Sequence, residues 1–230
     1  MDFEIRLRAL RHAYAVHDRF AETFGVACRK HCARCCTRNV VATTLEALLL
    51  AETVADRGRP EDFRRIASAM DGPRFAPRIT TNRLAEICVA GDDPPDEIEA
   101  DPAGGSCGLL EADICPVYPV RPLACRCMVS AEVCAPGGAA DMGPLTLTIN
   151  TVFMQTVEHL DAEGYSGNLA DLLRFMADPD NRKRYRESRL DAAPPGLVPN
   201  RPVPALMIPP EHREAVRPWI EALHRMPAGD

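Results

Sequence analysis

Long apolar runs are missing from this sequence of 230 residues. No stretch approaches the roughly 20 apolar residues that cross a bilayer, so no membrane partner is expected. The charged start, MDFEIRLRALRHAY, lacks the apolar region of a signal peptide, and we expect a cytoplasmic protein. Lysine is scarce, and the net charge is −6 without a basic tail, which argues against nucleic acid as a partner.

Familiar catalytic motifs are missing as well. The sequence has no GxGxxG, no P-loop, no HExxH and no nucleophile elbow. Serine, histidine and aspartate occur in no local arrangement that indicates a catalytic triad. The sequence therefore names no catalytic residue, and whether the protein is an enzyme stays open.

Cysteine is abundant, with ten residues, and most of them are clustered. An even number could form disulfides, as in small secreted domains. This chain is large, lacks an export signal and gathers its cysteines into blocks, a pattern more typical of metal binding or redox chemistry in a reducing compartment. Structural disulfides and unrelated free thiols are the alternatives.

Two blocks contain nine of the cysteines. The first is CRKHCARCC, residues 28–36, and the second spans residues 107–134. Closely spaced thiolates place two ligands on one zinc ion or iron–sulfur cluster, and a distant segment supplies the others. Because one tetrahedral site needs only four ligands, the number of thiols indicates two metals or one polynuclear cluster. The expected cofactor is an iron–sulfur cluster or zinc, and the predicted ligands are Cys28, Cys32, Cys35, Cys36, Cys107, Cys115 and Cys125, with Cys127 and Cys134 close behind them in the sequence.

The adjacent pair Cys35 and Cys36 carries further information. Neighbouring side chains diverge in extended backbone, so these two do not suit one mononuclear metal. Either they face two sites, or one is a ligand and the other is buried. Cys88, distant from both blocks on an apolar helix, is interpreted as a small core residue.

Basic residues accompany both blocks: Arg29, Lys30, Arg34, Arg38, Arg121 and Arg126. Such cations offset thiolate charge and lower thiol pKa values, although solvated surface arginines are the simpler alternative. His31, inside the first block, is either a ligand or a solvent-facing side chain.

The cysteine pattern resembles a known family. CxxxCxxCC is followed by a second half that reads CPVYPVRPLACR over residues 115–126, and the likeness covers residues 28–134. The pattern is similar to the bacterial YkgJ-type cysteine-cluster family, a zinc- or iron-chelating domain. The resemblance implies a metal-bound domain with eight cysteines, the eighth being Cys134 or Cys127. The family has also been likened to the flagellin lysine methylase, which shares a cysteine cluster.

Three residues of the second block are predicted to support the metal rather than to bind it. Tyr118 would donate its hydroxyl to a thiolate sulfur, and Arg121 would pair with the cluster or with a carboxylate. Arg126 is placed beside the thiolates, and Pro122 fixes the turn between Cys115 and Cys125.

Three functions fit these observations: a metal-binding module, a cluster-dependent enzyme that modifies a protein or small molecule, and a redox or metal-handling protein with a protein partner. An enzyme should have a pocket beside the cluster lined by arginine and tyrosine. A binding module should have a fully closed metal shell.

The predicted fold is mostly α: a compact helical domain around an irregular cysteine-rich metal-binding centre. Four segments are expected: an N-terminal helix (1–27), the cysteine domain (28–134), helices packed on it (135–190), and a proline-rich extension with a terminal helix (191–230). Thr43 with Glu46 indicates a capping box before residue 44. Apolar spacing, caps and glycine or proline stops predict helices over 3–25, 44–57, 59–70, 80–91, 121–127, 145–164, 167–178, 179–190 and 210–226. Strands are expected only at 40–43 and 203–208.

Overall fold

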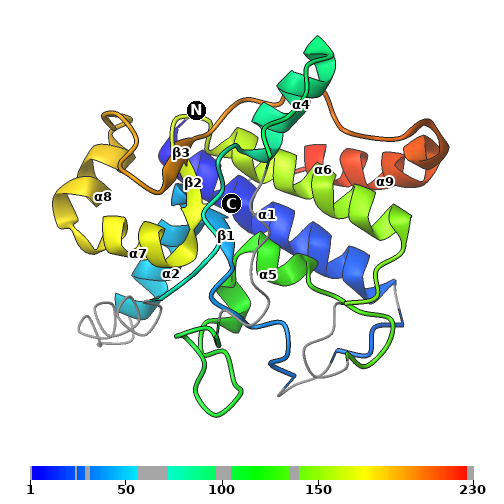
Figure 1. Ribbon diagram of the computed structural model, residues 1–230, viewed down its shortest axis with the longest axis horizontal. Helices are drawn as coiled ribbons and strands as arrows, with labels where there is room; N and C mark the ends of the chain where they lie inside the picture. The colour runs from blue at the N-terminus through cyan, green and yellow to red at the C-terminus, as the bar shows by residue number, and fades with distance from the viewer. Residues whose placement is uncertain are drawn as a thin grey trace.

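The computed structural model describes residues 2–23, 25–28, 32–55, 72–96, 105–134 and 140–226. The chain is mainly helical, as predicted (Figure 1). Its helices are α1 (Phe3–Glu22), α2 (Thr44–Ala55), α4 (Thr81–Ala90), α5 (Leu123–Cys127), α6 (Pro144–Leu160), α7 (Leu169–Ala177), α8 (Pro179–Arg186) and α9 (Arg213–His224), with 3-10 turns η1 (Tyr118–Val120) and η2 (Pro210–His212). No described helix is long and apolar enough to cross a membrane.

A small antiparallel sheet joins distant parts of the chain. Its strands, in spatial order, are β1 (Val41–Thr43), β2 (Tyr165–Asn168) and β3 (Leu197–Pro199). Val41 lies opposite Asn168, and Tyr165 lies opposite Pro199. The strand predicted at 40–43 is confirmed as β1, whereas β2 and β3 were not predicted.

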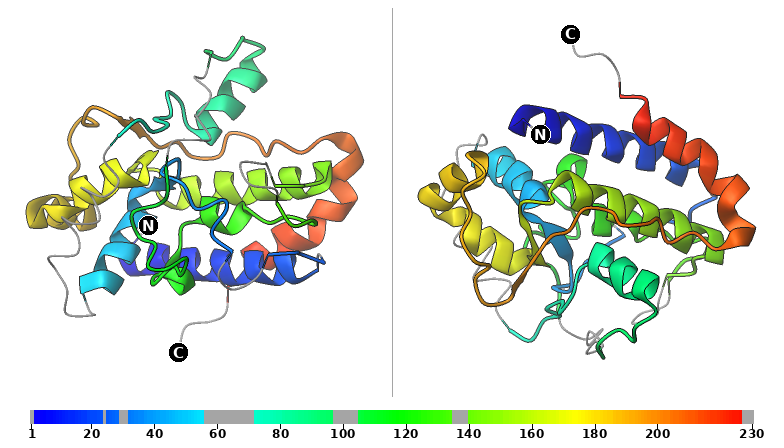
Figure 2. Two further views of the ribbon diagram at one scale, coloured as in Figure 1. Left: turned by 60° about the horizontal axis from the view of Figure 1, so that its bottom comes forward. Right: turned by 90° about the horizontal axis from the view of Figure 1, so that it is seen from above.

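The hydrophobic core takes residues from all four segments expected from the sequence, among them Leu10, Leu123, Phe153 and Leu197. Helix α2 is buried almost all round and packs against α7. Such a helix needs apolar residues on every side, which the run LEALLLA supplies. Helix α1 packs against α6 and α9, and Figure 2 shows α1 and α9 side by side when the molecule is seen from above.

The capping box predicted at the start of α2 is present. The Glu46 carboxylate accepts a hydrogen bond from the backbone N–H of Thr43 (2.8 Å), and the Thr43 hydroxyl accepts one from the backbone N–H of Glu46 (3.3 Å). Residues 56 and 57 of this predicted helix, and all of the helix predicted over 59–70, lie outside the described residues.

Three predictions near the sheet are wrong. Helix α6 ends at Leu160 rather than at Gly164, where a Cβ would lie 2.0 Å from the Thr44 hydroxyl oxygen. Helix α7 begins at Leu169, not at Gly167, because Asn168 caps it from the end of β2. The stretch 203–208 forms no strand. Pro204 removes a backbone donor there, and the Gln155 side chain bonds the backbone of Ala205 and Met207 instead.

The remaining described helices correspond to predicted ones. The expected helices over 3–25, 80–91, 121–127 and 179–190 are α1, α4, α5 and α8, each slightly shorter than predicted. The terminal helix is α9, which continues through Pro218.

A buried carboxylate joins four elements beside the sheet. Asp161 follows α6 and accepts hydrogen bonds from the Leu45 backbone N–H at the start of α2 (3.0 Å), from the Tyr185 hydroxyl on α8 (2.5 Å) and from the Asn200 side chain after β3 (3.1 Å). The Arg6 guanidinium of α1 lies 3.8 Å away. Burial raises the pKa of Asp161 from 3.8 to about 7.

Replacing Asp161 by asparagine is expected to flatten the dependence of stability on pH. The folded state of the wild type holds the Asp161 proton more tightly than the unfolded state. Its contribution is therefore complete below pH 3.8 and is lost as the pH rises to about 7. The loss is on the order of 4 kcal/mol.

Urea unfolding at pH 5 and pH 7.5 measures this dependence. Asp161→Asn should lose less stability between the two values than the wild type, while Asp93→Asn, which changes an exposed acid, should retain the wild-type difference. Equal differences in the wild type and Asp161→Asn would contradict the prediction.

Candidate metal centre

The two cysteine blocks lie against each other. The backbone N–H of Cys107 donates to the carbonyl of Cys36 (2.9 Å), and that of Arg38 donates to Gly105 (3.0 Å). Between these bonds, Thr37 and Ser106 form an isolated antiparallel bridge. The pairing places Cys36 beside Cys107, some seventy residues away in sequence.

A second contact joins the start of the first block to the end of the second. The backbone N–H of Ala27 donates to the carbonyl of Ser130 (2.9 Å), and the Arg34 guanidinium donates to the carbonyl of Cys134 (2.5 Å). Cys28 and Cys134 therefore lie in the same part of the site. Figure 1 draws the loops of both blocks below the helices, and α5, which carries Cys125 and Cys127, at their lower edge beside α1, so the cysteine-rich region lies along one side of the helices.

Four thiols gather at this second contact. Burial raises the pKa of the Cys28 thiol, and the negative charges of the thiolates of Cys32, Cys35 and Cys134 raise it further. These charges act on Cys28, so the other three thiols lie in its surroundings. We call Cys28, Cys32, Cys35 and Cys134 the first thiol set.

Four other thiols gather beside the pairing of Cys36 with Cys107. Burial raises the pKa of Cys125, and thiolate charge at Cys107 and Cys115 raises it further. The pKa of Cys36 is likewise raised by its neighbours Cys125 and Cys107, after the larger effects of its hydrogen bond to Cys35 and of burial. We call Cys36, Cys107, Cys115 and Cys125 the second thiol set.

Cys35 and Cys36 divide between the two sets. The Cys36 thiol donates a hydrogen bond to the sulfur of Cys35, which lowers the pKa of Cys35 and raises that of Cys36. The positive charge of Arg121 also lowers the pKa of Cys35. Cys35 in turn acts on Cys125, so the two sets adjoin each other.

All ten cysteines are described, and none forms a disulfide. Among the described residues, no three cysteine, histidine, aspartate or glutamate side chains are placed to hold a metal ion. The donor chemistry nevertheless fits the expected cofactors, because each set offers four sulfur atoms. Closing either set on a metal requires the sulfurs to come nearer to one another than they lie here.

Two cysteines stand apart from both sets. Cys127 is buried, with its sulfur 3.6 Å from Nε2 of His17, and the charges that act on it are those of Glu46 and Arg126. Cys88 is exposed on α4, so its interpretation as a core residue is wrong. The buried face of α4 consists of Asn82, Ala85 and Ile87 instead.

Arg126 anchors the second block to α1. Its guanidinium lies 2.6 and 2.7 Å from the two carboxylate oxygens of Asp18, donates to the Arg121 carbonyl (3.1 Å) and covers the Tyr14 ring at 4.2 Å. The positive charge of Arg126 is thus paired with the carboxylate of Asp18. Arg126 therefore fixes the turn before α5 on the N-terminal helix.

The other two residues predicted to support the metal, Tyr118 and Arg121, lie against each other. Tyr118 is 59% exposed, and its ring lies 3.7 Å from the Arg121 guanidinium carbon. Donation from the Tyr118 hydroxyl to a thiolate stays a prediction. Arg29, Lys30 and His31 lie outside the described residues.

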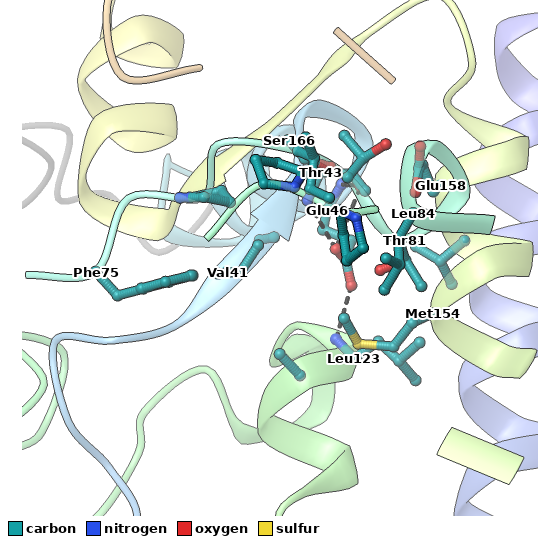
Figure 3. A pocket seen from close by; sticks show the side chains of 18 of the residues that line it. Val41, Thr43, Glu46, Phe75, Thr81, Leu84, Leu123, Met154, Glu158 and Ser166 are labelled. Atoms are coloured by element: carbon teal, nitrogen blue, oxygen red, sulfur yellow. Dashed lines mark hydrogen bonds between the residues drawn. The ribbon is translucent and has the colours of Figure 1, made fainter. Parts of the chain in front are cut away.

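Glu46 is the residue of the site that the sequence did not reveal. Its buried carboxylate accepts hydrogen bonds from the Leu123 backbone N–H at the start of α5 (2.7 Å) and from the Tyr14 hydroxyl (2.9 Å), and Figure 3 shows the bond to Leu123. Burial raises the pKa of Glu46, and its charge acts on Cys125. The capping box identified its contact with Thr43, but only the fold brings α5 to it.

The family comparison agrees with the cysteine pattern. Residues 27–140 match the family model CxxCxxCC, described as "Putative zinc- or iron-chelating domain", and all ten cysteines lie in this range. No curated protein and no solved structure matches the chain. Through residues 27–140, the chain belongs to the CxxCxxCC family of zinc- or iron-chelating domains.

Proposed function

We propose that this protein binds metal through eight cysteines arranged as two four-thiol sites. The observation that carries the proposal is the double contact between the blocks: Cys36 pairs with Cys107, while Ala27 bonds to Ser130 and Arg34 bonds to Cys134. The adjacent Cys35 and Cys36 then serve two sites that adjoin each other, with the hydrogen bond between their sulfurs at the boundary, and the side chains do not diverge as extended backbone would make them.

The residues around the thiols support this function. Arg121 offsets part of the thiolate charge at Cys35. Glu46 and Arg126 hold α5, the helix that carries Cys125, against the rest of the fold. Zinc in such sites would organise the two blocks, whereas an iron–sulfur cluster would supply electron transfer.

A cluster-dependent enzyme is the second candidate, because a pocket shares α5 with the second thiol set. Leu123 and Ala124 line it. No arginine or tyrosine occurs among the described residues that line it, which differs from the pocket expected of such an enzyme. A metal-binding module is therefore the better-supported function.

Anaerobic purification, followed by metal and sulfide analysis and a visible spectrum, tests the proposal. We expect either a colourless protein with about two zinc ions per chain, or a brown protein with iron and acid-labile sulfide. Cys88→Ser and Cys127→Ala should keep the wild-type metal content, since both residues lie outside the sets. Folded protein that takes up neither zinc nor iron with sulfide would overturn the proposal.

A further inference from the structure

A cavity of about 590 Å³ lies between the sheet, α4, α5 and α6. Figure 3 shows Val41 and Phe75 on one side of it and Thr81, Leu84 and Met154 on the other. Its volume is in the range of pockets that hold small molecules. No cysteine is among its described lining residues, so the cavity is distinct from both thiol sets.

Most of the lining is apolar. The apolar residues are Val41, Ala42, Phe75, Pro77, Ile79, Leu84, Pro94, Pro95, Leu123, Ala124, Met154 and Val157. They come from five separate segments and surround the cavity rather than forming one exposed face. A ligand that fills this space would bury mainly hydrocarbon.

All charged residues among the described lining of the cavity are acidic. Glu46, Glu158 and Asp96 line the cavity, and its described lining contains no lysine, arginine or histidine. Anionic ligands such as phosphates and carboxylates would be repelled by these carboxylates, whereas a cation would be attracted. The Arg78 guanidinium, which donates to the backbone carbonyl of Asp96 (3.3 Å), is not part of the described lining.

The three acids differ in the hydrogen bonds they already make. Glu46 accepts four, which occupy both of its oxygens. Glu158 accepts three, from the backbone N–H groups of Asn82 (2.8 Å) and Arg201 (2.9 Å), one on each oxygen, and from the Thr80 side chain. The exposed Asp96 side chain makes no hydrogen bond or ion pair to any described residue. Capacity for a new donor therefore lies at Glu158 and Asp96.

We propose that this cavity binds a small molecule with an apolar body and an ammonium group. The body packs against Phe75, Leu84 and Met154, and the ammonium group lies on the side of Glu158 and Asp96. The inference is independent of the identity of the metal, because the cavity needs no thiol.

Three probes of similar shape test the ligand class on the full chain: 4-phenylbutylamine, 4-phenylbutan-1-ol and 4-phenylbutanoate. Isothermal titration calorimetry at pH 7 should show the amine binding roughly ten times more tightly than the carboxylate, with the alcohol between them. Absence of binding by all three, or equal binding of the amine and the carboxylate, would overturn the proposal.

Paired variants locate the binding. Leu84→Trp fills the cavity and should weaken amine binding at least about tenfold, whereas Val89→Trp, at a position on the same helix that is 68% exposed, should leave it unchanged. Asp96→Asn should reduce the preference for amine over alcohol about two- to fivefold, and Asp93→Asn should not. Circular dichroism verifies that each variant is folded. Unchanged amine binding in folded Leu84→Trp would place the ligand elsewhere and overturn the proposal.

Discussion

Glu46→Ala is expected to lower the free energy of unfolding by about 3–5 kcal/mol. The substitution removes the acceptor of the Tyr14 hydroxyl and of the backbone N–H groups of Thr43 and Leu123, all at a carboxylate that is 2% exposed. Each buried donor left unpaired costs about 1–3 kcal/mol, and water entering from the adjacent cavity offsets part of the total. Urea unfolding monitored by circular dichroism measures the loss.

Two variants separate this effect from a general effect on α2. Glu52→Ala, on the same helix, removes an ion pair with Arg186 at the surface and should cost no more than about 1 kcal/mol. Glu46→Gln keeps one oxygen acceptor and should fall between the two. A cost below about 1 kcal/mol for Glu46→Ala would show that the network does not hold α5 in place.

Local signals made most helices predictable. The Thr43–Glu46 capping box and the left-handed Gly91 after α4 are determined by residues within one turn of the helix end. Apolar spacing adds the buried face of each helix. Neither signal depends on how distant segments meet, so both can be read directly from sequence.

The sheet depends on distant contacts instead. The Asn168 side chain at the end of β2 donates to the carbonyls of Arg38 (2.8 Å) and Phe75 (2.9 Å), which fixes three segments together. All four residues of β2 are buried, so it lacks the polar and apolar alternation of a half-exposed strand. The strands β2 and β3 form because their partners are present, and the sequence around these two strands gives no sign of the pairing.

The candidate metal site, like the fold, could be predicted where it depends on local sequence but not where it depends on contacts between distant segments. The density of cysteines predicted two interacting blocks, but not how their thiols group. Cys127 and Cys134 were equivalent candidates from spacing alone, whereas the fold turns Cys127 toward His17 and brings the Cys134 backbone to Arg34. Arg126 was interpreted from its proximity to the thiolates, yet its charge is used by Asp18 on α1, a partner 108 residues away.

Pairs of cysteine substitutions should distinguish two metal sites from one shared cluster. If the thiol sets are separate sites, Cys28→Ser with Cys134→Ser damages only the first and should leave about half of the wild-type metal. Cys28→Ser with Cys107→Ser damages both and should leave almost none. Each variant removes two thiols, so the number of lost ligands cannot explain the difference.

The adjacent pair provides the strictest form of this test. Cys35 and Cys36 are neighbours in sequence but belong to different sets, so Cys35→Ser with Cys36→Ser should behave like the cross-set pair and lose nearly all metal. Metal content per folded chain, from elemental analysis with circular dichroism as the check on folding, gives the result. Equal losses in the same-set and cross-set pairs would indicate that all eight thiols hold one polynuclear cluster. In that case the contacts between Cys36 and Cys107 and between Arg34 and Cys134 would be two sides of a single site.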